Sequence, residues 1–230
     1  MTEKMENTNP TQVQPRLERI RMVYARGEEL RYVSHLDTQL VWERTLRRAG
    51  VPLAHSQGFN PHPRLHMASA LPLGFLSRCE ILDFWMIAPE PGDGTTLDVA
   101  DLTARIQAAA PPGLTILSSE SAPLNEPALQ VQVQFAEYCA VPLDPIGDAA
   151  LATATAALMG AETLPRERRG KPYDLRPLIE QLEAQPGDPP ALFMRLMAQA
   201  SATGRPEEVL EALGFDPTAF RVERLRLILG

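Results

Sequence analysis

The sequence predicts an α+β protein built from two tandem ferredoxin-like (βαββαβ) domains. The first observation is element order, because strand-type and helix-type segments alternate as strand–helix–strand–strand–helix–strand. The second is a weaker repeat of that order beyond a polar, proline-containing link at 121–127. The third is length, since 230 residues suit two domains of about 100 residues each. We therefore expect a flexible tail at 1–15, a first domain at 16–122 and a second at 128–230.

Periodicity and turn residues define the elements of the first domain. Residues 17–26 alternate apolar and polar side chains, with Ile20 and Met22 on one face, which is typical of a half-buried strand. Ser34 can cap the following helix, and Asp37 occupies the capping-box position. The other expected elements are that helix at 36–49, strands at 65–70 and 80–87, a break at Asp93 and Gly94, a helix at 99–110 and a strand at 114–118.

The second domain is less regular. Residues 131–141 begin with a clean alternation and are expected to form a strand, and the alanine-rich residues 149–159 a helix. Pro206 at the start and Gly214 at the end delimit another helix. The remaining expected elements are a short strand at 161–167, an inserted helix at 174–184, and strands at 191–200 and 220–229.

Composition excludes several classes of protein. Hydrophobic residues make up 44% and charged residues 22%, which is the globular range, and no apolar run approaches a membrane span. The polar N-terminus carries no apolar signal segment. Only two cysteines occur, Cys79 and Cys139, too few for a disulfide scaffold, a four-cysteine zinc site or an iron–sulfur cluster. We expect a cytoplasmic protein that holds no metal or cofactor itself and does not enter a membrane.

The net charge of −7 is unevenly distributed. Residues 16–90 sum to +2, residues 91–165 to −8 and residues 166–230 to zero. Twenty of the 22 basic residues are arginine, whose planar guanidinium suits phosphate or carboxylate. Codon bias explains the same excess, because alanine and proline are abundant too. Any RNA binding is therefore expected to be local.

All four histidines, at positions 35, 55, 62 and 66, fall within 32 residues. Among them runs the loop His55-Ser-Gln-Gly-Phe-Asn-Pro-His-Pro-Arg64, where a glycine permits positive φ and two prolines stiffen the chain. A stiff loop loses little entropy on binding, although it also suits a plain connector. We expect it to pack beside the start of helix 36–49. Its candidate substrate-binding residues are Ser56, Gly58, Phe59, Asn60, His62 and Arg64.

His35 and His62 are the candidate catalytic residues. Metal-free RNA cleavage needs a base near neutral pKa and a cation for the phosphate, for which Arg64 or Arg44 qualifies. The alternative for His35 is a packed residue at a helix start, beside the further binding candidates Ser34 and Asp37. A metal site of two histidines and one carboxylate is conceivable from His62, His66 and the His35–Asp37 pair. We do not expect it, because Pro61 and Pro63 exclude a helix at His62 and because His35 and Asp37 diverge on theirs.

Two basic clusters could contact phosphate. Arg44, Arg47 and Arg48 share a helix face, which is otherwise a solvated face partly neutralised by a Glu43–Arg47 pair. The second is a glycine hairpin in which Tyr173 could serve as a stacking platform, or which is simply an exposed turn. Its candidate residues are Arg166, Arg169, Lys171, Tyr173 and Arg176.

Several strings together resemble the radical-SAM-linked protein family, a bacterial domain of unknown function, in its stand-alone form. The resemblance covers nearly the whole chain after residue 17. It implies a partner, a radical-SAM protein with a cobalamin-binding-type domain, and supplies no reaction or catalytic residues. The strings are Ser34-His-Leu-Asp37, Glu43-Arg44, Leu46-Arg-Arg-Ala-Gly50, Ser56-Gln-Gly-Phe-Asn-Pro-His-Pro-Arg64, Leu71-Pro-Leu-Gly74, Lys171-Pro-Tyr-Asp-Leu-Arg-Pro177 and Gly204-Arg-Pro-Glu-Glu-Val-Leu210.

Three functions follow as expectations. The first is an accessory protein without catalytic activity of its own, which acts with a radical-SAM enzyme and binds or presents an RNA or protein substrate. The second is a metal-free endoribonuclease of the tandem ferredoxin-like type, like the CRISPR repeat-processing enzymes. Their glycine-rich loop near the C-terminus is not evident here, where Gly214 stands alone. The third is a structural scaffold.

Overall fold

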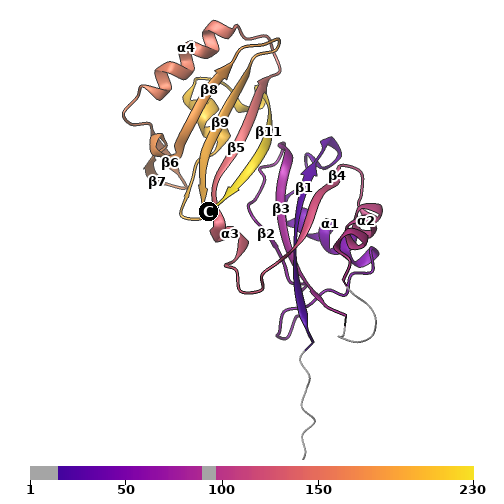
Figure 1. The fold of residues 1–230 in the computed structure, drawn as a ribbon. Coiled ribbons are helices and arrows are strands. Elements are labelled where there is room, and N and C mark those ends of the chain that lie inside the picture. Colours follow the sequence, from indigo (N-terminus) through magenta and orange to yellow (C-terminus); the bar gives the residue numbers. More distant parts are fainter. Residues whose placement is uncertain (1–14, 90–96) are drawn as a thin grey trace, which may run out of the picture.

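A computed structural model describes residues 15–89 and 97–230. It shows a mixed α+β protein with one large, mostly antiparallel sheet and few helices (Figure 1). In these two ranges no helix is long and apolar enough to cross a membrane. The expected tail, apart from Pro15, and the break at Asp93 and Gly94 lie outside the described residues.

The first half contains the six expected elements in the expected order. Its strands lie side by side as β4-β1-β3-β2, and every neighbouring pair is antiparallel. The helices cover one face, where Trp42 and Leu46 pack with Ile20, Met22 and Leu82 in a first core. The elements are β1 (Leu17–Arg26), α1 (His35–Arg48), β2 (Leu65–Met67), β3 (Leu76–Ile87), α2 (Val99–Ala109) and β4 (Leu114–Ala122), with a 3-10 turn at Glu28–Leu30.

The second half has a similar arrangement with an inserted hairpin. Its main strands lie as β8-β9-β5-β11, again antiparallel, and enclose a second core. The elements are α3 (Leu129–Gln132), β5 (Val133–Pro142), α4 (Asp148–Met159), β6 (Pro165–Arg168), β7 (Lys171–Asp174), β8 (Ile179–Gln185), β9 (Ala191–Gln199), β10 (Ala202–Thr203), α5 (Pro206–Ala212) and β11 (Phe220–Leu229), with 3-10 turns at Arg176–Leu178 and Pro217–Ala219.

One expected element was wrong, and one begins two residues later than expected. Residues 174–184 are mostly strand β8 rather than a helix. A register shift between Ile179 and Gln181 places Ile179 and Leu182, three residues apart, in the same core, and this spacing imitates a helix. The strand expected over 131–141 is confirmed as β5, but residues 131 and 132 belong to the preceding one-turn helix α3, so that Leu129 on α3 and Val133 at the start of β5 are both buried.

The two halves share the sheet. Strand β11 pairs in parallel with β3, through Glu223 with Leu76 and Arg224 with Ser77 (Figure 1). The buried Arg224 places Nη1 2.9 and 3.0 Å from the two carboxylate oxygens of Glu80, and its Nη2 donates to the carbonyl of Ala70 at 2.8 Å. An ion pair between the halves is therefore sealed from water.

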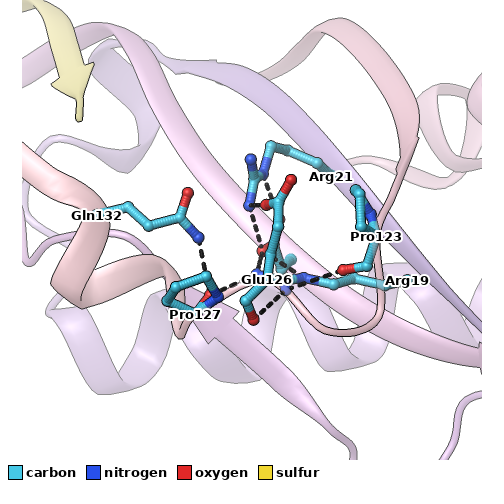
Figure 2. A network of polar contacts seen from close by, with 7 residues as sticks. Arg19, Arg21, Pro123, Glu126, Pro127 and Gln132 are labelled. Atoms are coloured by element: carbon cyan, nitrogen blue, oxygen red, sulfur yellow. Dashed lines mark hydrogen bonds and ion pairs between the residues drawn. The ribbon is translucent and has the colours of Figure 1, made fainter.

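A second buried arginine fixes the link between the halves (Figure 2). Arg19 donates to Asp83 through Nε at 2.9 Å and Nη2 at 2.5 Å, and Arg21 donates to the same carboxylate. Arg21 also reaches Glu126 at 2.9 Å. This network of side chains lies on the face of the sheet that α1 and α2 do not cover. Arg19 additionally donates to the link carbonyls of Pro123, Glu126 and Pro127 at 3.3, 3.0 and 3.1 Å.

We expect Arg19→Met to lower the free energy of unfolding by about 3–5 kcal/mol, because it leaves the buried Asp83 without one of its cations and frees the link carbonyls. The matched control is Arg16→Met, whose exposed pair with Glu18 should be worth less than about 1 kcal/mol. Urea denaturation of both variants measures this. Equal losses would contradict the role assigned to Arg19.

Candidate functional site: the groove under loop 55–64

The loop between α1 and β2 is closed at its base. Ala54 donates its backbone N–H to the carbonyl of Trp85, and Arg64 donates to that of Ala54, both at 2.8 Å. Ser56 donates to the carbonyl of His62 at 2.8 Å, and its hydroxyl accepts from the His62 N–H at 3.1 Å. Gly58 at the turn has φ 142°, a conformation that favours glycine. These hydrogen bonds close residues 55–64 into a small ring at the end of β3, called the tied ring below.

The tip of this ring is apolar and uncovered. Residues 55–62 are all exposed, and Phe59 has a relative exposure of 107%, so it has no contact that shields it from solvent. A large aromatic side chain held in this way on a tied loop is typical of a contact surface for another molecule.

Beneath the ring opens a groove of about 1000 Å³. His66 alternates along β2 with Leu65 and Met67, which belong to the helix-side core, so the groove opens on the opposite face of the sheet. The guanidinium of Arg64 lies 4.6 Å from the ring centroid of Trp85, and the His66 ring packs edge-on against that indole at 4.9 Å. The lining residues are Pro15, Leu17, Leu53, Ala54, His55, Ser56, Gln57, Arg64, His66 and Ile87.

The described lining of the groove is basic. It contains Arg64, His55 and His66 and no carboxylate. Burial, and then the charge of Arg64, lower the pKa of His66, whose Nδ1 is buried without a hydrogen-bond partner. The His66 imidazole is therefore neutral at pH 7 and can accept a proton or a polar ligand. His55 Nδ1 lies 3.0 Å from the carbonyl of Leu53.

The start of α1 lies elsewhere. Ser34 caps the helix, since its Oγ accepts from the Asp37 N–H at 3.1 Å and donates to the Asp37 carboxylate at 2.7 Å. His35 is half-buried, and burial lowers its pKa; the charged groups acting on it are Glu80, Arg26 and Arg224. The Ser34 cap is confirmed, but the Asp37 carboxylate accepts from the Ser34 hydroxyl rather than from the Ser34 backbone N–H of a capping box.

The expectation that the loop packs beside the start of the helix was wrong. His35 lies near the Glu80 end of β3, whereas the loop is bonded to Trp85 and Leu53 bridges to Met86. Six residues of strand separate the two places by about 20 Å. The structure therefore does not bring His35 and His62 together, because α1 runs the length of the sheet between them.

The arginines of α1 lie on the helix-covered side of the sheet, away from the groove. All three are exposed, and Arg48 donates to the carbonyl of Ala109 at 2.7 Å, which ties α1 to the end of α2. The expected Glu43–Arg47 pair is absent from the ion pairs of the described chain, and Glu43 instead accepts from Gln39 at 3.3 Å. Arg44 and Arg47 remain as solvated cations.

The hairpin β6–β7 is bound to α5. Arg168 and the Tyr173 hydroxyl both donate to Glu208, each at 2.5 Å, and the Arg168 guanidinium lies 4.8 Å from the Tyr173 ring centroid. Tyr173 is therefore not an open stacking platform, which corrects that interpretation. Arg169 and Gly170 form the turn with positive φ. Arg166 is half-buried and Lys171 exposed.

Arg176 has a structural role. Its two terminal nitrogens donate to the carbonyls of Ile179 at 3.1 Å and Met159 at 3.2 Å, which joins the end of α4 to the start of β8. Its guanidinium is thus already engaged inside the fold.

A second cavity, of about 460 Å³, lies where the two halves meet. Leu71 and Pro72 line it from the first half, and the segment Gly204–Glu207 lines it from the second, above the buried Arg224. Two strings that are 130 residues apart in the sequence therefore meet. Burial raises the pKa of Glu207, whose Oε2 is buried without a hydrogen-bond partner.

Comparison with known proteins places the chain in a family. The family model described as "Uncharacterized protein conserved in bacteria (DUF2344)" matches residues 19–206. The chain belongs to this family. No curated protein matches it. A solved structure, "Crystal Structure of an Unknown Protein from Galdieria sulphuraria", is 13% identical over 93% of this chain and 100% of that one, with a TM-score of 0.27.

Sequence reasoning did not single out several groups that organise this DUF2344 chain. Arg19, Asp83, Glu80 and Arg224 look like ordinary charges of half-exposed strands, because alternation does not show that both sheet faces are covered. The partnership of Arg168 with Glu208 spans 40 residues and has no local signal. Across the described ranges no three potential ligand side chains gather as a metal site.

We expect Glu207→Gln to raise the melting temperature of the protein at pH 8. Burial raises the folded-state pKa of Glu207 above its unfolded value, so stability is lost as the pH rises through the unfolded-state pKa, the penalty is complete above the folded-state pKa, and it vanishes when both states are protonated. Thermal unfolding at pH 4 and pH 8 should show the gain at the higher pH only. Glu211→Gln, exposed on the same helix, is the control and should show none.

Proposed function

We propose that this protein is an accessory protein that acts with a radical-SAM enzyme and presents a substrate to it. The observation that carries the proposal is the tied ring 55–64 with the fully exposed Phe59 at its tip. The sequence resemblance supplies the class of partner, and the ring supplies a surface that fits an intermolecular contact.

We infer that each half is a ferredoxin-like unit and that the two are arranged in tandem. This is supported by the antiparallel order β4-β1-β3-β2 in one half and β11-β5-β9-β8 in the other. Both orders place the last strand beside the first and the second strand at an edge. The hairpin β6–β7 is then an insertion into the second unit.

The geometry gives more support to a protein contact than to an RNA track. Arg44 and Arg47 lie over the helices, Arg169 and Lys171 at a distant hairpin, and Arg64 in the groove. A phosphate backbone requires cations in a continuous row, and these do not form one. A ribonuclease centred on His35 has less support still, because the neighbouring Arg26 and Arg224 are buried in structural contacts.

We expect Phe59→Ala to reduce recovery of the radical-SAM partner by about tenfold or more in affinity purification from the native cell, since a central aromatic contact is worth about 2 kcal/mol. The control is Leu117→Ala, which removes another exposed apolar side chain, on β4. Both variants should melt like the parent.

The bound material is then analysed for iron, sulfide, protein and RNA. An iron–sulfur protein lost with Phe59→Ala and kept with Leu117→Ala is the expected result. RNA in place of that protein would favour direct RNA binding. Equal recovery of partner by both variants would remove the ring from the proposal.

We expect the purified chain to bind no iron–sulfur cluster when reconstituted anaerobically. A cluster commonly takes four cysteine ligands, and this chain has two, on β3 and β5. Iron and sulfide assays measure the outcome. Stoichiometric iron and sulfide that survive gel filtration would assign the cluster chemistry to this chain itself.

A further inference from the structure

We propose that the groove under loop 55–64 binds a phosphate group of the substrate, held by Arg64 together with His55 and His66. The inference deepens the proposed function, on which it rests in taking the groove as part of the substrate site. It names the ligand chemistry, a tetrahedral dianion, and it is tested without any partner.

The positive charge of Arg64 has no partner in the described chain. In the described part of the chain Arg64 makes no ion pair, although three arginines and two carboxylates cluster on this face of the sheet. Asp83 is engaged by Arg19 and Arg21, and Glu126 by Arg21. Arg64 is therefore a cation without an internal counter-ion, beside a groove whose described lining has no acid.

Trp85 restrains the orientation of the Arg64 guanidinium. Stacking against Trp85, which is only 5% exposed, restrains the guanidinium plane of Arg64. The N–H groups at the edge of a stacked guanidinium are left for bidentate bonding to an oxyanion. Because no internal acceptor bonds to Arg64 in the described chain, this edge is open to a ligand.

The number of hydrogen-bond donors in the groove favours phosphate over carboxylate. Besides Arg64, the groove offers the Ser56 hydroxyl, whose oxygen accepts from His62 and whose hydrogen is still available, and the Gln57 amide. The imidazole rings of His55 and His66 add further N–H donors. This set exceeds what the two oxygens of a carboxylate use and suits a tetrahedral anion.

Anion binding in the groove should depend on pH through His66. The charged groups that act on His66 are Arg64, Asp83 and Arg19, and burial with Arg64 keeps the ring neutral at pH 7. A dianion favours the protonated ring, so binding should tighten as the pH falls. Sulfate is the suitable probe, because its charge stays constant between pH 6 and pH 8, whereas phosphate and its monoesters gain a proton as the pH falls.

The experiment is isothermal titration of the full chain with inorganic phosphate, sulfate and acetate. We expect phosphate and sulfate to bind, acetate to bind at least tenfold more weakly, and sulfate to bind more tightly at pH 6 than at pH 8. Arg64→Gln should weaken phosphate binding tenfold or more, with partial rescue by Arg64→Lys. Arg44→Gln, on the other side of the sheet, should bind like the parent.

A nucleoside 5′-monophosphate and O-phosphoserine form two further arms that distinguish the source of the phosphate. Preference for one identifies the substrate class, and equal binding assigns the site to the phosphate group alone. His66→Gln is the second variant, should Arg64→Gln unfold, and should weaken sulfate binding and reduce its pH dependence while leaving a folded chain.

The inference is overturned if no anion binds at millimolar concentration, or if Arg64→Gln binds like the parent. Phe59→Ala should keep phosphate binding, since the ring tip is outside the groove. If the parent chain recovers the partner but binds no phosphate, this inference fails alone; if it binds phosphate but recovers no radical-SAM partner, the proposed function fails alone.

Discussion

Two buried arginines, Arg19 and Arg224, hold the chain in one arrangement. Each neutralises a carboxylate that is sealed from water, Asp83 and Glu80 respectively, and each also donates to backbone carbonyls outside its own strand. A buried charge that loses its partner is strongly destabilising, so these contacts form together or the arrangement is lost. The halves are consequently joined by polar contacts as well as by the short parallel pairing of β11 with β3.

The same network determines what the open face of the first half can do. Because Asp83 is occupied by Arg19 and Arg21, it does not neutralise Arg64, which faces the groove instead. Trp85 packs against both Arg19 and Arg64, at 5.1 and 4.6 Å, and so connects the buried network with the groove. The ring that carries Phe59 is bonded to the backbone of this same tryptophan. The binding surface and the structural network therefore both contact strand β3, through Trp85 and Asp83.

Local patterns in the sequence predict what depends on local contacts. The alternation in 17–26, the helix cap at Ser34 and the positive φ of Gly58 are all as predicted, because each reflects neighbouring residues. Helix 174–184 was wrong because a bulge changed the spacing of the buried residues in β8. The candidate loop lies on the sheet but not beside His35, since sequence proximity does not tell at which end of α1 a returning loop docks. The loop sequence predicts Arg64 as a binding residue. Its contact with Trp85 depends on the register of β2 against β3, which the sequence does not show.

The most direct test of this account is differential scanning calorimetry of the full chain. If the buried Arg224–Glu80 ion pair joins the halves, the protein unfolds in one transition whose calorimetric and van't Hoff enthalpies agree, although it has two hydrophobic cores. Two separate transitions, each with the enthalpy of about 100 residues, would show that the halves unfold independently and would contradict the account.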